Sequence, residues 1–158
     1  MISGLPGAGK STIALQVAEA FDARGTLYIS EEMPLELLRS YRDRVAPTIE
    51  NMTAWHAPDF QDVLEYLAEK RPALVVLDSL QRVGEEESAS LKELLRVCGQ
   101  MQSAILVLCH ATKAGDFAGL LASQHDVDIS LWVRRDEEGA FVQTVKNRHG
   151  PAPLETKL

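Results

Sequence analysis

Apolar residues follow two different spacings along the first two thirds of the chain. Short apolar runs predict strands at residues 1–3, 26–30, 73–77 and 104–109, and a weaker run predicts one at 49–55. The runs at 73–77 and 104–109 lack polar alternation, which is typical of strands that are covered on both faces. Between the runs, apolar residues recur every three or four positions and predict amphipathic helices.

The predicted helices are bounded by residues that favour helix ends. The first begins near Ser11 and ends at Gly25. The second has Pro34 in its first turn, and the third is capped by Asp59. The residues Leu91, Leu94, Leu95 and Cys98 have helical spacing and predict a fourth helix. Regular alternation of helices and strands predicts an α/β fold with a mostly parallel central sheet flanked by helices.

The pattern changes after about residue 125. Apolar residues now occupy every second position at 127–133, and the polar turn 136–139 leads into a second β-rich run at 140–145. This arrangement predicts a C-terminal antiparallel hairpin. The last residues, 151–158, fit either a short edge strand or a loose tail.

Composition narrows the class of protein. We expect the 158 residues, 1–158, to form a single domain, since 46% hydrophobic and 25% charged residues are usual for a soluble globular protein. A net charge of −7 argues against tight non-specific nucleic-acid binding by the monomer, although it leaves room for a local basic patch. We find no membrane span or signal peptide, and Cys98 and Cys109 fit no metal spacing. A cytoplasmic protein with two buried thiols is therefore expected.

The N-terminal segment carries a complete G-x-x-x-x-G-K-S/T phosphate-binding loop. Its glycines allow the backbone amides to surround a phosphate, and the helix that follows adds the positive end of its dipole. We expect Lys10 to reach the β- and γ-phosphates and the Ser11 hydroxyl to ligate Mg²⁺. The expected nucleotide-binding residues are Gly4, Leu5, Pro6, Gly7, Ala8, Gly9, Lys10, Ser11 and Thr12.

Acidic residues follow two of the predicted strands, where open α/β sheets bind their ligands. Asp78 comes after the strand 73–77 and is a candidate Mg²⁺ ligand, although an aspartate can also simply begin a turn there. Glu31 and Glu32 follow the strand 26–30. Either carboxylate could orient the attacking water, and either could instead only favour the N-terminus of the next helix.

Basic and imidazole groups follow the later strands. His110 comes after the strand 104–109, where it could hydrogen-bond a γ-phosphate or serve as a structural histidine. Lys146 and Arg148 end the hairpin. They fit either a solvated basic strand end or a charge clamp on phosphate.

Three stretches resemble the ATPase core of the RecA/RadA superfamily, namely 27–32, 109–115 and 145–151. The last is close to the K-N-R-F-G signature of bacterial RadA (Sms), with His149 in place of the phenylalanine. DnaB-type helicases and KaiC are more distantly similar. The resemblance covers essentially the whole chain and implies a RecA-like P-loop fold that hydrolyses ATP with Mg²⁺ in DNA recombination, repair or replication.

The resemblance also implies roles for individual residues. Glu32 matches the catalytic glutamate, with Glu31 as the alternative, and His110 matches the residue that senses the γ-phosphate. Lys146 and Arg148 match residues that reach the ATP of a neighbouring subunit. A homo-oligomer, either a ring or a filament with shared sites, is therefore expected.

Differences from the family pattern leave other functions open. The four-cysteine zinc finger and the protease-like C-terminal domain of RadA are absent from these residues. Acidic residues at 85–87, and Asp116 beside Lys113, weaken the expectation of single-stranded DNA as a partner, because backbone binding needs several cations. The alternatives are a P-loop small-molecule or nucleotide kinase, and a KaiC-like ATP-binding regulatory module.

Overall fold

The computed structural model describes residues 1–78, 87–110 and 127–158, except the side chains of residues 87 and 88. The acidic residues at 85–86, which weaken the expectation of a DNA partner, and the segment from Lys113 to Asp116 lie outside the described residues. The described chain forms two compact units, one of residues 12–107 and one of residues 1–11 together with 108–158.

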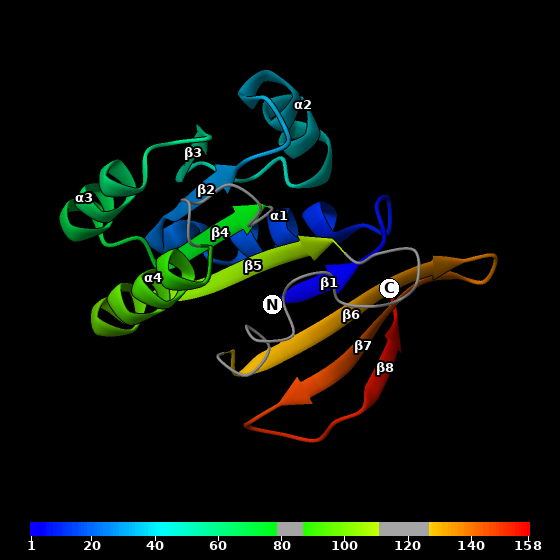
Figure 1. Cartoon of the computed structure of the whole chain (residues 1–158). Helices are drawn as coiled ribbons and strands as arrows, with labels where there is room; N and C mark the ends of the chain where they lie inside the picture. Colours follow the sequence, from blue (N-terminus) through cyan, green and yellow to red (C-terminus); the bar gives the residue numbers. More distant parts are fainter. Residues whose placement is uncertain (79–86, 111–126) are drawn as a thin grey trace. The chain divides into compact units, whose positions relative to one another are not determined.

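The unit 12–107 is built on parallel strands with helices beside them (Figure 1). Strand β2 lies between β3 and β4, and its last residue, Ser30, is in register with the last residues of both, His56 and Asp78. The strands are β2 (Thr26–Ser30), β3 (Met52–His56), β4 (Leu74–Asp78) and the first part of β5 (Ala104–His110). The helices are α1 (Lys10–Ala20), the 3-10 turn η1 (Asp22–Arg24), α2 (Leu35–Val45), α3 (Phe60–Lys70) and α4 (Glu87–Met101).

The unit of residues 1–11 and 108–158 places β1 between the end of β5 and β6, parallel to both. It contains β1 (Ile2–Gly4), β6 (Ile129–Asp136), β7 (Gly139–Asn147) and β8 (Leu154–Lys157). Strands β7 and β8 continue antiparallel, so the predicted hairpin is confirmed and the tail is an edge strand. Along the whole sheet the hydrogen-bonded order is β3-β2-β4-β5-β1-β6-β7-β8.

Burial explains why the short apolar runs are strands. Every residue of β2 and β4 is buried, including Tyr28 and Val75 with no exposed surface. Asp59 caps α3 as predicted, its carboxylate accepting from the Gln61 backbone N–H at 2.8 Å. The predicted end of the first helix differs by a few residues from the observed end. The α-helix after the phosphate-binding loop ends at Ala20, and η1 carries the chain on to Gly25.

One irregularity in β6 reverses the expected alternation of buried apolar and exposed polar residues. The pairing with β7 shifts its register between Ser130 and Leu131, as a β-bulge does. Ser130 is consequently fully buried, whereas the apolar Ile129 keeps 41% of its surface exposed. A one-residue shift moves side chains to the other face of a sheet, and periodicity alone does not reveal where such a shift occurs.

Candidate functional site

The phosphate-binding loop joins β1 to α1 and has the backbone that an anion site requires. Gly7 and Gly9 have φ angles of +78° and +105°, which L side chains rarely adopt. A Cβ at either position would meet no atom within 4 Å, so the demand for glycine is conformational. Such a loop, opening onto the N-terminus of a helix, turns backbone N–H groups toward a bound phosphate.

Lys10 is the charged centre of this loop. Its side chain is only 5% exposed, and its Nζ donates to the carbonyl oxygens of Gly4 at 3.0 Å and Leu5 at 3.1 Å. Nζ also lies 3.4 Å from Nδ1 of His110, at the end of β5. Because an ammonium group only donates, Nδ1 is the acceptor in this contact. The fold therefore brings together two of the predicted site residues, Lys10 and His110.

Gly4 is required for a different reason, namely close packing. A Cβ at Gly4 would lie 2.3 Å from the carbonyl oxygen of Val133, its partner in the β1–β6 pairing. Backbone atoms in a central strand pairing cannot move aside cheaply. The start of the phosphate-binding loop is thus held directly against β6.

We predict that Gly4→Ala lowers the free energy of unfolding by about 1–3 kcal/mol, the usual cost of overpacking. Gly99→Ala is the control, because Gly99 lies in α4 with nothing near its added Cβ. That substitution should stabilise the protein by about 0.5–1 kcal/mol through helix propensity. Urea denaturation measures both changes, and an unaltered midpoint for Gly4→Ala would contradict the close contact.

Ser11 and Thr12 lie in the first turn of α1 and are half-buried. Thr12 was predicted to bind nucleotide. Its hydroxyl shares a short hydrogen bond with the Tyr41 hydroxyl on α2. The sequence pattern did not indicate this partner, because the spacing of Tyr41 predicted only that it lies on the apolar face of the helix after Pro34.

Asp78 ends β4 and is 6% exposed. Its Oδ2 accepts from the Tyr28 hydroxyl at 2.7 Å, a bond that holds the carboxylate in one orientation at the end of the strand. Carboxylate oxygens are the ligands that Mg²⁺ prefers, so the donor chemistry of Asp78 and of the Ser11 hydroxyl fits that ion. Tyr28 was missed by sequence reasoning because it stands inside an apolar strand.

Glu31 and Glu32 leave β2 in a tight turn. The Ser30 hydroxyl accepts from the Met33 backbone N–H at 3.0 Å and donates to the Met33 carbonyl at 2.8 Å. The backbone N–H of Glu31 donates to the Asp78 carbonyl at 3.1 Å, so the ends of β2 and β4 are joined. Glu31 is half-buried and Glu32 is exposed. The two residues therefore differ in exposure, and the backbone of Glu31 is bound to the end of β4.

Lys146 and Arg148 lie at the end of β7 as predicted. Arg148 is exposed, and its guanidinium forms an ion pair with Asp128 at 3.0 Å. Its backbone N–H also donates to the Asp128 carbonyl at 3.0 Å. Exposed ion pairs contribute only about 0–1 kcal/mol, so this contact does not prevent Arg148 from binding another anion. Lys146 is half-buried and pairs with Ser130 across the hairpin.

A cavity of about 240 Å³ lies beside the phosphate-binding loop, within the same unit. One wall is the loop segment from Leu5 to Ala8, and the other is the β6 segment from Trp132 to Arg135. Arg134 packs over the Phe141 ring at 4.1 Å and pairs with Glu155 at 3.2 Å. The sequence did not indicate that these β6 residues line a cavity, because their pattern predicts only a β-strand.

The two cysteines are buried, as predicted. Burial raises the pKa of the Cys98 thiol to about 11, and it raises the pKa of the Cys109 thiol to about 11 as well. Both thiols therefore stay protonated at neutral pH, and a protonated thiol is a poor nucleophile.

A strand, a glycine-rich loop and a helix around a buried lysine define the class of P-loop nucleotide-binding proteins. The chain belongs to the ATPase family associated with various cellular activities (AAA), whose sequence model matches residues 1–135. In the part of the chain that the structure describes, no helix has the length and apolarity needed to cross a membrane.

Similar proteins confirm the predicted resemblance. The chain is 33% identical to the DNA repair protein RadA of Treponema pallidum over 162 residues, which cover 95% of this chain and 35% of that protein. It is 32% identical to RadA of Mycobacterium tuberculosis over 169 residues, with 96% and 35% covered. The chain thus spans about a third of the length of these relatives.

A solved structure confirms the predicted fold. The KaiC-like protein of Pyrococcus horikoshii superposes with a TM-score of 0.72 over 98% of this chain and 81% of its own, at 17% sequence identity. The predicted RecA-like architecture, mostly parallel with antiparallel C-terminal strands, is therefore correct.

Proposed function

We propose that this chain hydrolyses ATP with Mg²⁺ and acts in DNA repair as an oligomer with shared active sites. The observation that carries the proposal is the buried Lys10 ammonium inside a loop of positive-φ glycines. A buried ammonium group that donates to backbone carbonyl oxygens is well placed to exchange them for the stronger acceptor oxygens of a phosphate.

Each remaining residue has a role in this proposal. Ser11 and Asp78 would hold Mg²⁺, which neutralises charge on the β- and γ-phosphates when bound. Glu32, or Glu31 in its place, would orient the attacking water and accept its proton. His110 lies beside Lys10 and would donate a hydrogen bond to the γ-phosphate from its Nε2.

Support for a role in DNA repair comes from the relatives named DNA repair protein RadA, which match 95–96% of this chain. The first test is release of inorganic phosphate from ATP in the presence of Mg²⁺ and without any acceptor molecule. Release without an acceptor favours an ATPase over a kinase. Stimulation of that release by single-stranded DNA favours a repair protein over a regulatory module that only binds ATP.

If active sites are shared between subunits, mixing two inactive variants should restore activity. Lys10→Ala removes the phosphate-binding ammonium, and Arg148→Ala removes the guanidinium proposed to reach a neighbour's ATP. Each variant alone is expected to be inactive, since a guanidinium supplied in trans contributes about 10³–10⁵-fold to such rates. Mixing the two should restore part of the activity, because some interfaces then join an intact loop to an intact arginine.

The measurement is phosphate release as a function of the mixing ratio at a concentration where the protein assembles. Arg39→Ala is the matched control, since it removes an exposed guanidinium from α2, outside the proposed site. It should remain active alone. Absence of any recovery in the Lys10→Ala and Arg148→Ala mixture, with assembly confirmed by light scattering, would count against an arginine acting in trans.

A further inference from the structure

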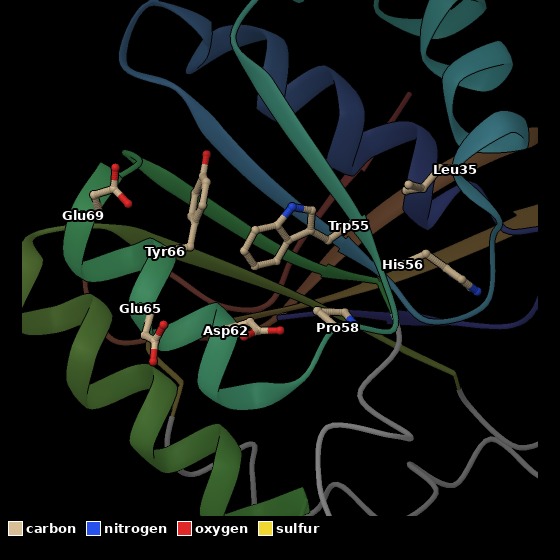
Figure 2. A pocket seen from close by; sticks show the side chains of 8 residues that line it. All are labelled: Leu35, Trp55, His56, Pro58, Asp62, Glu65, Tyr66 and Glu69. Carbon is tan, nitrogen blue, oxygen red and sulfur yellow. The ribbon is translucent and has the colours of Figure 1, made fainter.

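A second cavity lies in the unit 12–107, and the proposed ATPase function does not use it. Its volume is about 580 Å³, which is within the range of about 300–1,000 Å³ usual for ligand sites. It opens between β3, the first turn of α2 and one face of α3 (Figure 2). Five of its lining residues determine its chemistry: Trp55, Asp62, Glu65, Tyr66 and Glu69.

Two aromatic rings form one side of this cavity. Trp55 on β3 and Tyr66 on α3 meet edge to face, with ring centroids 4.9 Å apart and planes at 68°. The Tyr66 hydroxyl donates to the Thr53 hydroxyl at 2.7 Å, which fixes the phenol ring against the strand. Both rings are only half-buried, so part of their surface faces the cavity and Figure 2 shows them side by side.

Three carboxylates follow the same face of α3 along the cavity. Asp62, Glu65 and Glu69 are spaced at i, i+3 and i+7, so they span about 10 Å along the helix axis. All three are exposed. The Gln61 amide donates to Glu65 at 3.2 Å, and Lys70 pairs with Glu69 at 2.6 Å, but neither neighbour is among the residues that line the cavity. The cavity thus combines two aromatic rings with three carboxylates.

This combination matches the chemistry of a guanidinium group. Arginine stacks on the face of tryptophan or tyrosine, and its planar fork binds carboxylates in two-point contacts. One small cation cannot reach carboxylates spread over about 10 Å. An extended peptide covers that distance in about three residues, since a strand rises about 3.3 Å per residue.

The edge of the sheet also favours a peptide. β3 is the first strand in the hydrogen-bonded order and pairs only with β2 among the described strands. Its other edge presents backbone N–H and C=O groups that a second extended chain can bind. A peptide at this edge would lie beside the Trp55 ring.

We propose that the Trp55–Tyr66 cavity binds an arginine-bearing, extended segment of a partner protein. Arginine side chains of that segment pack against the two rings and pair with the carboxylates of α3. None of its lining residues belongs to the phosphate-binding loop, so it provides a means of attaching the ATPase to a basic partner.

The test uses a fluorescein-labelled peptide, Gly-Arg-Gly-Arg-Gly-Arg-Gly, and its counterpart with citrulline in place of each arginine. Fluorescence anisotropy with the full chain should detect the arginine peptide, and binding should weaken as salt is raised. The triple variant Asp62→Asn, Glu65→Gln, Glu69→Gln should weaken it at least about tenfold. Trp55→Leu should weaken it about three- to fivefold through loss of the cation–π contact.

The charge control is a second triple variant, Glu50→Gln, Glu137→Gln, Glu138→Gln, whose residues are exposed and do not line the cavity. It changes the net charge equally and should bind the peptide like the wild type. Trp132→Phe leaves Trp55 as the one tryptophan of the chain, and its emission should change when the peptide binds. Phosphate release from ATP by the cavity variants should match the wild type, which shows that they fold.

Three results would overturn the proposal. They are no binding of the arginine peptide, whether or not spermidine binds, equal binding of the citrulline peptide, and equal weakening by the two triple variants. Because ATP hydrolysis is measured on the same proteins, failure of the cavity proposal is distinct from failure of the proposed ATPase function.

Discussion

Replacing Lys10 with alanine is expected to weaken ATP binding at least about a hundredfold. The Nζ group donates to the Gly4 and Leu5 carbonyls, and Lys10 is only 5% exposed. A charge-assisted hydrogen bond contributes about 1.5–3 kcal/mol, and one Lys10 ammonium would make more than one such bond to the β- and γ-phosphates.

Isothermal titration calorimetry with ATP and Mg²⁺ measures this loss. Alanine is the strongest helix former, so α1 should persist in the variant, and circular dichroism can check it. Lys92→Ala is the matched control, because it removes an exposed ammonium from α4. Binding by Lys10→Ala within about twofold of the wild type would show that this loop is not the phosphate site.

Replacing Glu32 with glutamine is expected to leave ATP binding intact and to reduce turnover about 10²–10⁴-fold. That is the usual contribution of a positioned general base, and glutamine keeps the shape of the side chain while losing its basicity. The Ser30–Met33 turn does not depend on this carboxylate, so the backbone at the end of β2 should be unchanged.

Glu31→Gln is the matched variant, one residue away in the same turn. Single-turnover phosphate release and ATP affinity should be measured for both. Full turnover by Glu32→Gln together with loss of turnover by Glu31→Gln would assign the base to Glu31, whose N–H is tied to the end of β4. Full turnover by both variants would show that neither carboxylate acts as the base.

Most of the fold could be predicted because local rules and tertiary packing agree along this chain. The run that became β4 is apolar from Leu74 to Leu77, and the run that became β2 is apolar from Leu27 to Ile29, which is typical of strands covered on both faces. Asp59 capped α3 because its short carboxylate reaches the free N–H groups of the first turn. The bulge at Ser130 could not be predicted, since a register shift depends on the partner strand.

The candidate site also has features that the sequence predicts and features that only the tertiary structure gives. The order of glycines, lysine and serine by itself determined a phosphate-binding loop, because positive φ angles and a helix N-terminus are local properties. Only the tertiary structure decided that Lys10 meets His110, and that Tyr28 holds Asp78. The Trp55–Tyr66 cavity belongs to this second group too. The Lys10–His110 and Tyr28–Asp78 contacts join residues 100 and 50 positions apart, and the cavity joins a strand to a helix, so no short-range pattern predicts which side chains folding brings together.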